Sequence, residues 1–474
     1  MSFHPADIAV ILLYVAAILY IGFVVSKKKE SGDTSSAADF ILAGRKVTLP
    51  FFIGTLVATW YGSILGVGEF VYTSGIVGWV CFGFPYYIAA ALFAVLLAGK
   101  IREAPAHTIP EQVKNTYGSR AGWISSLIVL VITIPAAYIL MLGVVVNLFS
   151  GWPLWLAILI GAVISLIYLY KGGFRADVLT NMAQFVLMYA GFGALLFFAV
   201  KDFGSFGVMA GKLPESHTKP FGGLSWQYII AWYIISFQTF VDPSFHQRCA
   251  AAESPKTAKN GILISILFWA VFDFFTLFAG LYAKAFFEID NPLMAYPILG
   301  EALLPPVWKG IFTVALLATI MSTLDSYAFI SAATIGNDIL KPLGKKIKIF
   351  AGKSTKTLTQ AGLIISGTAG VIMAIALPSA VDLIYYTSSI AVPGLLIPLS
   401  VSFSGRLKLL PGHAVLIMVA SSSASAIWLI ISKINESLGI ELFNFFALYE
   451  PMLPGIFVSI LLSLIFIRYK RPKG

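Results

Sequence analysis

The sequence predicts an all-α membrane protein with about thirteen transmembrane helices. Of its 474 residues, 58% are hydrophobic and 11% are Asp, Glu, Lys or Arg, whereas charged residues make up about 25% of an ordinary soluble domain. The apolar residues form long unbroken runs, which favour helices over the short alternating segments of barrel strands. Because lipid offers the backbone no hydrogen-bond partners, each run must satisfy its own, as a helix does.

A spanning helix needs about 20 predominantly apolar residues, and thirteen runs approach that length. We expect the spans at 6–26, 51–74, 76–99, 122–149, 152–171, 177–201, 225–247, 261–288, 308–340, 358–378, 380–404, 411–432 and 450–468.

The basic residues between the spans predict the orientation, since Lys and Arg gather in cytoplasmic connections. With the N-terminus outside, all but six of the 32 Lys and Arg residues fall on the cytoplasmic side, among them the run Lys27, Lys28 and Lys29. We therefore expect a plasma- or inner-membrane protein whose C-terminus is cytoplasmic. This distribution explains the net charge of +10 without a nucleic-acid partner. The six exceptions are Lys201, Lys212, Lys219, Lys284, Lys309 and Lys433.

Ten of the spans suggest an inverted repeat, the plan of many secondary transporters. Five spans in 51–201 start at the inner face and five in 225–404 start at the outer face, so the two sets have opposite topology. We expect residues 1–50 to form a peripheral helix and an inner loop, 202–224 an outer loop, and 405–474 two peripheral helices.

In such a plan the first helix of each repeat is interrupted near the midplane, where free carbonyl groups bind ions. The first of these helices contains Gly54, Gly62, Gly66 and Gly68, which permit a break but are equally consistent with close helix packing. In its counterpart, Pro243 follows Asp242 and should break or kink the helix.

Hydroxyl groups recur at helical spacing in span 308–340. Thr319, Ser322, Thr323 and Ser326 share one helix face and could bind Na⁺, a hard cation that prefers oxygen ligands. Alternatively, the hydroxyls bond back to the preceding turn or hold helices together. Asp325 lies among them, and a carboxylate within a membrane is by default a functional hypothesis.

Other functional classes find little support in the sequence. Two cysteines and five scattered histidines form neither a disulfide framework nor a metal motif, and no nucleophile–base pair is evident, so we expect no catalytic residues. No Lys or Arg falls in the middle of an expected span, and the acids there should leave the interior negative and suited to cations.

Four segments resemble motifs of the sodium:solute symporter family. They are DFILAGR at 39–45, TIPEQ at 108–112 with Tyr117-Gly118 after it, KGGFR at 171–175 with Asp177 and TNMAQ at 180–184, and QRCAAAESPK at 247–256. The family includes sodium-coupled glucose, proline, pantothenate and sialic acid transporters. The resemblance implies a LeuT-like fold and a sodium site made by the side chains of Ser322 and Thr323 and the carbonyl groups of Leu56, Thr59 and Thr319.

The resemblance fails at one position. Many members have Asp where this chain has Asn181, and some use it with hydroxyls of the eighth core helix to bind a second sodium. We hypothesise that the carboxylate has moved across the pocket to Asp325, so that Asn181 faces Asp325 and Ser326 completes a second cation site. The alternative is that this site is absent.

The resemblance also implies the function and the solute contacts. We expect sodium-coupled symport of a small organic solute by alternating access, in a lipid bilayer and without an obligatory protein partner. Proton coupling is the alternative, since Asp325 could carry a proton. The solute should meet residues of three core helices, which are Trp60, Tyr61, Ser63, Tyr138, Met141, Phe237, Gln238, Phe240 and Asp242.

Overall fold

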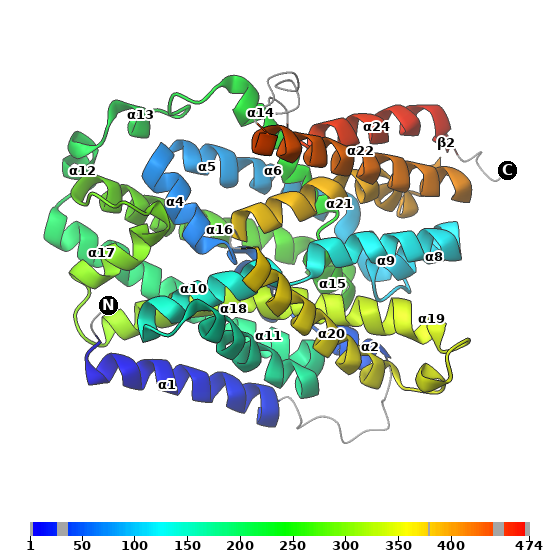
Figure 1. Ribbon diagram of the computed structural model, residues 1–474, viewed down its shortest axis with the longest axis horizontal. Coiled ribbons are helices and arrows are strands. Elements are labelled where there is room, and N and C mark those ends of the chain that lie inside the picture. Colours follow the sequence, from blue (N-terminus) through cyan, green and yellow to red (C-terminus); the bar gives the residue numbers. More distant parts are fainter. Residues whose placement is uncertain (1–2, 26–36, 378–379, 439–449, 470–474) are drawn as a thin grey trace.

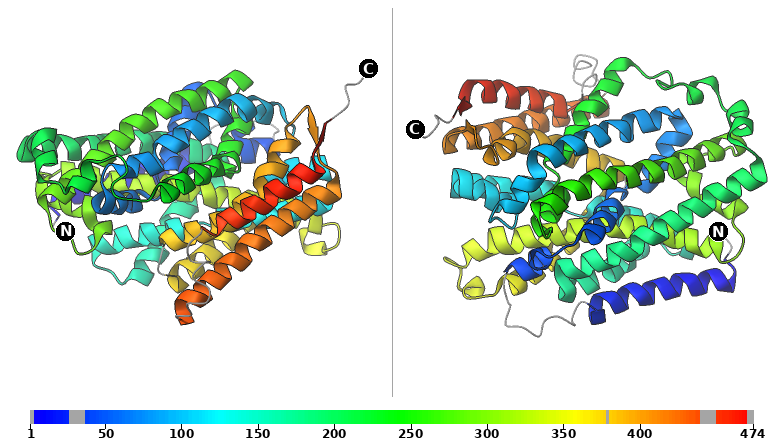
Figure 2. Two further views of the ribbon diagram at one scale, coloured as in Figure 1. Left: turned by 90° about the horizontal axis from the view of Figure 1, so that it is seen from above. Right: turned by 180° about the vertical axis from the view of Figure 1, so that it is seen from behind.

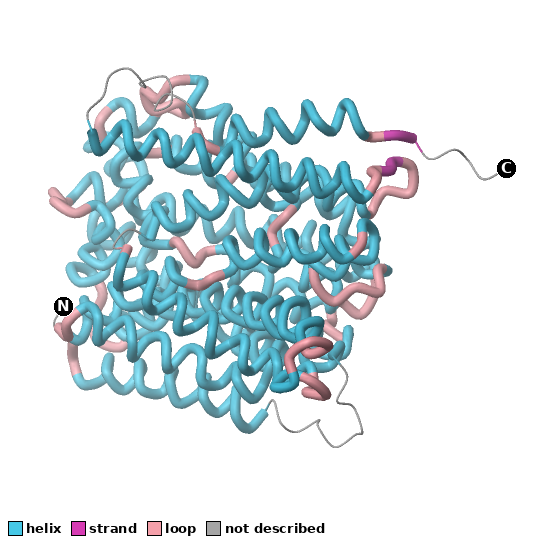
Figure 3. The backbone as a smooth tube through the Cα atoms, turned by 45° about the vertical axis from the view of Figure 1, so that its right-hand side comes forward, coloured by secondary structure: helices cyan, strands magenta, loops and turns pink. Residues whose placement is uncertain are grey.

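Helices make up almost all of the molecule (Figure 3). The computed structural model describes residues 3–25, 37–377, 380–438 and 450–469, so Lys27, Lys28 and Lys29 lie outside the described residues. Among these, two short strands, β1 (Leu407–Lys408) and β2 (Arg468–Tyr469), pair antiparallel. The long helices run roughly parallel to one another in one bundle (Figure 1).

Within the described residues, eight helices are long and apolar enough to cross a membrane, or nine if one bent pair counts as a span, and α24 (Met452–Phe466) is a shorter apolar helix. The expected number of thirteen therefore stays a prediction. One reason is α11 (Leu154–Phe203), which contains two expected spans separated by a single non-helical residue, Gly173, at φ 58°.

The outer surface of the bundle is apolar. Leu13 of α1 (Pro5–Tyr20), Ile372 of α20 (Thr355–Ala376) and Leu464 of α24 are 70%, 62% and 78% exposed. Large aliphatic side chains at such exposure are stable in contact with lipid, whereas water would penalise each of them. This surface confirms the membrane class.

Among the helices long enough to span a membrane, α18 (Trp308–Ala333) is the most buried, and nearly every residue in it is inaccessible. By contrast, α1 lies at one edge of the bundle and α22 (Pro411–Leu438) and α24 lie at the other (Figure 1 and Figure 2). These are the three helices expected to be peripheral. The N-terminal turn of α1 nevertheless contacts the buried helix α18. The Asp7 carboxylate accepts hydrogen bonds from the Val307 and Gly310 amides at the start of α18, both at 2.8 Å.

Both expected helix breaks are present. α3 (Leu49–Trp60) and α4 (Ile64–Ser74) meet at 57° across residues 61–63. In the second repeat, α14 (Trp226–Ile235) continues as a 3₁₀ turn, η5 (Ser236–Phe240), before α15 (Pro243–Ala251). Asp242 caps α15 by accepting from the Ser244 amide at 2.7 Å, and Pro243 suits the first turn because its missing N–H has no partner there.

The remaining helices connect these elements. The first half contains η1 (Ile21–Val25), α2 (Ala37–Leu42), η3 (Ala43–Arg45), α5 (Val77–Phe82), α6 (Phe84–Phe93), η4 (Ala94–Ala98), α7 (Gly99–Glu103), α8 (Ile109–Tyr117), α9 (Ser119–Thr133), α10 (Ala136–Ser150), α12 (Phe206–Lys212) and α13 (Glu215–Thr218). The second half contains α16 (Pro255–Phe286), η6 (Pro292–Met294), α17 (Ala295–Leu303), η7 (Thr334–Leu340), α19 (Lys341–Leu343), η8 (Lys348–Phe350) and α21 (Ala380–Ser402).

The DFILAGR segment has a structural role. The Arg45 guanidinium donates to the carbonyl groups of Ala104, Pro105 and Ala106 at 2.9–3.1 Å, and neighbouring Val47 forms a parallel bridge with Ala252. Two motifs that are far apart in the sequence are thereby joined on one face of the bundle.

Candidate functional site

The expected sodium ligands lie where α18 crosses the end of α3. The Ser322 hydroxyl donates to the Ala58 carbonyl at 2.7 Å, and the Thr323 hydroxyl donates to the Thr59 carbonyl at 2.8 Å. The Thr319 carbonyl accepts from Ser322 at 2.9 Å. Because the last carbonyl groups of a helix have no helical partner, the break of α3 leaves oxygen atoms free to face these hydroxyls.

Gly62 allows this approach. A methyl group at its position would lie 2.6 Å from the Cβ atom of Thr323, which is closer than two carbon atoms that are not bonded to each other can approach. Leu56, whose carbonyl was expected as a ligand, is buried one turn before Thr59. In this structure the Ala58 carbonyl, rather than that of Leu56, accepts the hydrogen bond from Ser322.

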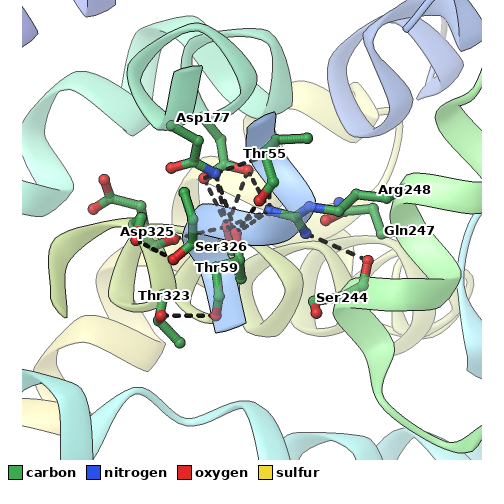
Figure 4. Close-up of polar contacts among 12 residues, drawn as sticks. Thr55, Thr59, Asp177, Ser244, Gln247, Arg248, Thr323, Asp325 and Ser326 are labelled. Carbon is green, nitrogen blue, oxygen red and sulfur yellow. Dashed lines mark hydrogen bonds and ion pairs between the residues drawn. The ribbon is translucent and has the colours of Figure 1, made fainter. Parts of the chain in front are cut away.

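A second polar cluster lies beside the first. It consists of Thr55 and Thr59 of α3, Asp177 of α11, Arg248 of α15 and Ser326 of α18 (Figure 4), together with Asn181 of α11, and we call it the Arg248 cluster. All six side chains are at most 4% exposed. The Arg248 guanidinium donates to the hydroxyls of Thr55 at 3.0 Å, Thr59 at 2.5 Å and Ser326 at 2.8 Å.

The charges of this cluster are opposite. Arg248 lies 3.5 Å from the Asp177 carboxylate, and both side chains are fully buried. Asp177 also accepts from the Ser326 hydroxyl at 2.9 Å and from the Asn181 amide at 3.2 Å. A buried ion pair is stable only when further hydrogen bonds satisfy its remaining polar atoms. The three hydroxyls bond one terminal nitrogen of Arg248, whereas its buried Nε atom has no partner among the described residues.

The position of Arg248 corrects two expectations. Its sequence neighbourhood placed it in a cytoplasmic connection, and no basic residue was expected within the membrane interior. The break at Val241–Asp242 instead turns α15 inward, so that Arg248 faces the core. One signal in the sequence could have indicated the buried arginine. Asp177 lies in an expected span with no basic residue in the middle of any span to pair with it, and an acid inside a membrane almost always has a partner.

The expected pairing of Asn181 with Asp325 is also wrong. The Asn181 amide donates to Thr55 at 2.9 Å, to Thr59 and Ser326 at 3.3 Å each, and to Asp177. Asp325 instead accepts from the hydroxyls of Ser165 and Tyr168. Consecutive residues of a helix point about 100° apart, so Asp325 and Ser326 face different neighbours.

A cavity lies next to the break of the second repeat. It encloses about 650 Å³, its open mouth included, and its lining includes Tyr138 of α10, Gln238 of η5, Asp242 and Tyr327 of α18. The Tyr327 hydroxyl donates to the Asp242 carboxylate at 2.9 Å, and the rings of Tyr138 and Tyr327 are 5.2 Å apart. Three of the nine expected solute contacts, Tyr138, Gln238 and Asp242, therefore meet in one cavity.

The other expected solute contacts lie outside the lining of this cavity. Trp60 packs on Tyr86 at 5.3 Å between ring centroids, and Gln238 donates to the Tyr86 hydroxyl at 3.1 Å. Tyr86 therefore lies between Trp60 and Gln238, which lines the cavity. The Tyr61 hydroxyl points to α16 and donates to Asp273 at 2.8 Å. The remaining four residues are Ser63, Met141, Phe237 and Phe240.

A second cavity lies farther along the same helices, next to the 104–108 connection between α7 and α8. Ile330 of α18 lines this cavity, and Tyr327, one turn earlier, lines the first. Likewise, Pro243 lines the second cavity and Asp242 lines the first. The lining residues of the two cavities are therefore about one helical turn apart along α18, and we call the layer at Tyr327 and Ile330 the septum.

Several curated proteins are similar to this chain. High-affinity choline transporter 1 of Drosophila melanogaster is 24% identical over 402 residues, which cover 79% of this chain and 63% of that protein. The sodium/pantothenate symporter of Haemophilus influenzae is 26% identical over 379 residues, which cover 74% of this chain and 76% of that protein.

Solved structures and a sequence model of a family identify the chain further. A Na⁺-coupled sialic acid symporter, at 17% identity, matches with a TM-score of 0.80 over 99% of this chain and 100% of that one. A nucleobase-cation-symport-1 family transporter matches at 0.57, with 14% identity, over 90% and 94%. These likenesses confirm the expected LeuT-like fold. The family model of the sodium:solute symporters matches residues 40–400, so the chain belongs to the sodium:solute symporter family and thereby to the sodium-coupled secondary transporters.

Proposed function

We propose that this protein carries a small organic solute together with sodium, which binds where α3 breaks against α18. The observation that supports this most directly is the approach of two hydroxyls, Ser322 and Thr323, to two backbone carbonyl groups at the end of α3, at 2.7 and 2.8 Å. Sodium would replace these hydrogen bonds with ion–oxygen contacts. The carbonyl groups of Thr319 and Leu56 would complete the ligand set.

Sodium at this position would join two elements that must separate for the solute to leave. Holding α3 against α18 favours one conformation, and a solute that binds the same conformation would bind more tightly with sodium present. Coupling of this kind is reciprocal, so the solute should raise the affinity for sodium by the same factor.

The cavity at Asp242 is the proposed solute site. Among the described residues that line it, Asp242 is acidic and none is Lys, Arg or His. A carboxylate beside the rings of Tyr138 and Tyr327 attracts a cation and repels an anion. We therefore propose a neutral or positively charged solute. Of the solutes named for the relatives, choline and glucose have such a charge, whereas pantothenate is an anion.

The test of this proposal is uptake by the full-length protein in proteoliposomes. Labelled choline, glucose, proline and pantothenate would be offered with an inward gradient of sodium or of potassium. We expect sodium-dependent uptake of a neutral or cationic solute, reduced at least tenfold by Asp242→Asn and unchanged by the exposed control Asp202→Asn. Sodium-dependent uptake of pantothenate alone would contradict the assigned charge, and uptake driven by a proton gradient without sodium would contradict the coupling.

We also propose that the N-terminus is outside and the C-terminus cytoplasmic. α1 begins at one end of the helices and β2 lies at the other (Figure 1), which is what an odd number of crossings requires. The basic residues support the assignment of sides, because all but six of them fall in the segments expected to be cytoplasmic. We assign no catalytic residues and no obligatory protein partner, and we divide the repeats at 51–201 and 225–404.

A further inference from the structure

The Arg248 cluster has the oxygen atoms of a cation site. Hydroxyls of Thr55, Thr59 and Ser326 and the carboxylate of Asp177 converge from three helices, and all are buried. Oxygen ligands that include a carboxylate are what a hard cation binds. In this structure a guanidinium group already lies among them, within 3.5 Å of every one of these four side chains.

The charges of the cluster balance without an ion. Asp177 contributes one negative charge and Arg248 one positive charge, which it cannot lose because guanidinium stays protonated in proteins. Asn181 is neutral at the position where many members of the family have Asp. A sodium ion in this cluster would lie beside a like charge without a second carboxylate to offset it.

The cluster also touches the proposed sodium site. Thr59 offers its carbonyl to Thr323 at 2.8 Å and its hydroxyl to Arg248 at 2.5 Å. On α18, Ser326 follows Ser322 by one turn, and its hydroxyl also donates to the Ser322 carbonyl at 2.9 Å. Whatever occupies the cluster therefore helps to hold α3 against α18.

From this geometry we propose that Arg248 is a tethered cation that takes the place of a second sodium ion, so that one sodium accompanies each solute. The proposal rests on the sodium site proposed above, at Ser322 and Thr323. It differs from a moved carboxylate at Asp325, because the acid that the cluster uses is Asp177, one helical turn before Asn181 on the same helix.

The experiment counts sodium ions bound to the purified full-length protein, with radioactive sodium as the probe and no solute. We expect one saturable site per chain, and we expect Thr323→Ala to abolish it. Two sites per chain would overturn the inference while leaving sodium coupling intact. A site that survives in Thr323→Ala and disappears on adding Asp177→Asn would also overturn it. No sodium binding at all would overturn the proposed sodium site itself.

Substitution of the arginine provides the converse test. Arg248→Gln leaves Asp177 without its counter-charge and frees three hydroxyls, so we expect a second sodium to bind, giving two per chain. Arg248→Lys keeps the positive charge and should stay at one, and Asp177→Asn added to Arg248→Gln should return the count to one. If folded Arg248→Gln binds a single ion, the arginine does not stand in for sodium. If that variant does not fold, the Thr323→Ala and Asp177→Asn pair decides alone.

Discussion

Thr59 shows how much a single residue can connect at this site. Its carbonyl accepts from Thr323, and its hydroxyl accepts from Arg248 and donates to the Thr55 carbonyl at 2.7 Å. One residue at the end of a broken helix therefore meets α18, α15 and its own preceding turn. This concentration of contacts explains why single hydroxyl groups here should matter for sodium rather than for folding.

The first prediction concerns the Thr323 hydroxyl. Thr323→Ala removes an oxygen atom that faces the Thr59 carbonyl, and we expect sodium affinity to fall at least tenfold, a change of about 1.4 kcal/mol. Tryptophan fluorescence titrated with NaCl against choline chloride measures it. The matched control is Thr313→Ala on the same helix, whose buried hydroxyl donates only to the Lys309 carbonyl. Equal sodium affinity in both variants would contradict the assignment of Thr323.

At the scale of single residues, the sequence predicted the positions of the hydroxyl groups well and those of the charged groups poorly. Spacing alone places Ser322, Thr323 and Ser326 on one face, since a helix repeats every 3.6 residues, and the structure directs all three toward α3. The burial of Arg248 depends on the direction that α15 takes after its break, which is a tertiary property. A charged residue beside a loop motif gives no local sign that it will turn inward.

The broken helices show what a short element can do that a straight one cannot. α3 ends and α4 begins within three residues, with a bend of 57°, and this exposes carbonyl groups in the middle of the bundle. In the sequence, the glycines of the first helix permitted a break without requiring one, and Pro243 predicted the second break. The sequence did not predict the 3₁₀ turn of η5, because Ser236–Phe240 has no residue type that distinguishes a 3₁₀ turn from an α-helix.

The second prediction concerns the close approach at the first break. Gly62→Ala places a methyl group 2.6 Å from the Cβ atom of Thr323, so α3 and α18 must move apart. We expect sodium binding to be lost while the protein still elutes as a folded species on gel filtration. Gly211→Ala is the control, because nothing lies within 4 Å of the added atom there. Normal sodium affinity in Gly62→Ala would show that the break tolerates a wider spacing.

The third prediction concerns the contact between α1 and α18. Asp7 accepts two backbone hydrogen bonds at the start of α18, and loss of such a cap costs about 1 kcal/mol. We therefore expect Asp7→Ala to lower the thermal unfolding temperature in detergent, with sodium affinity unchanged. Asp202→Ala, at an exposed position, should leave the unfolding temperature as it is. An unchanged unfolding temperature in Asp7→Ala would mean that water replaces the carboxylate at no cost.

The class of the whole molecule, a bundle of membrane helices, could be predicted from the hydropathy and the number of its apolar runs. Long apolar runs predict helices, and the apolar outer surface of the bundle agrees with them. Separate crossings are harder to predict, because α11 contains two of them with a single non-helical residue between. The way in which the helices pack also has no local signature, so the resemblance to a family carried that part of the prediction.

The fourth prediction tests the orientation in the membrane. Cys81 and Cys249 are both buried, so an introduced surface cysteine can be labelled in their presence. In intact cells we expect a membrane-impermeant maleimide to label Lys219→Cys, on the proposed outer side, and to label Lys353→Cys only after the cells are opened. Both positions are exposed. The reverse pattern would place the N-terminus in the cytoplasm.

The septum between the two cavities has an electrical consequence. If each cavity fills with water and ions from its own side of the membrane, the potentials of the two compartments come to within about 5.4 Å of each other, the height of one helical turn. Most of the membrane voltage would then fall across the level of Tyr327 and Ile330 instead of across the full thickness of the bilayer. A sodium ion crossing this short distance would collect nearly all of the roughly 2.3 kcal/mol per 100 mV that a unit charge can gain, and transport currents should depend steeply on voltage even though little of the protein moves.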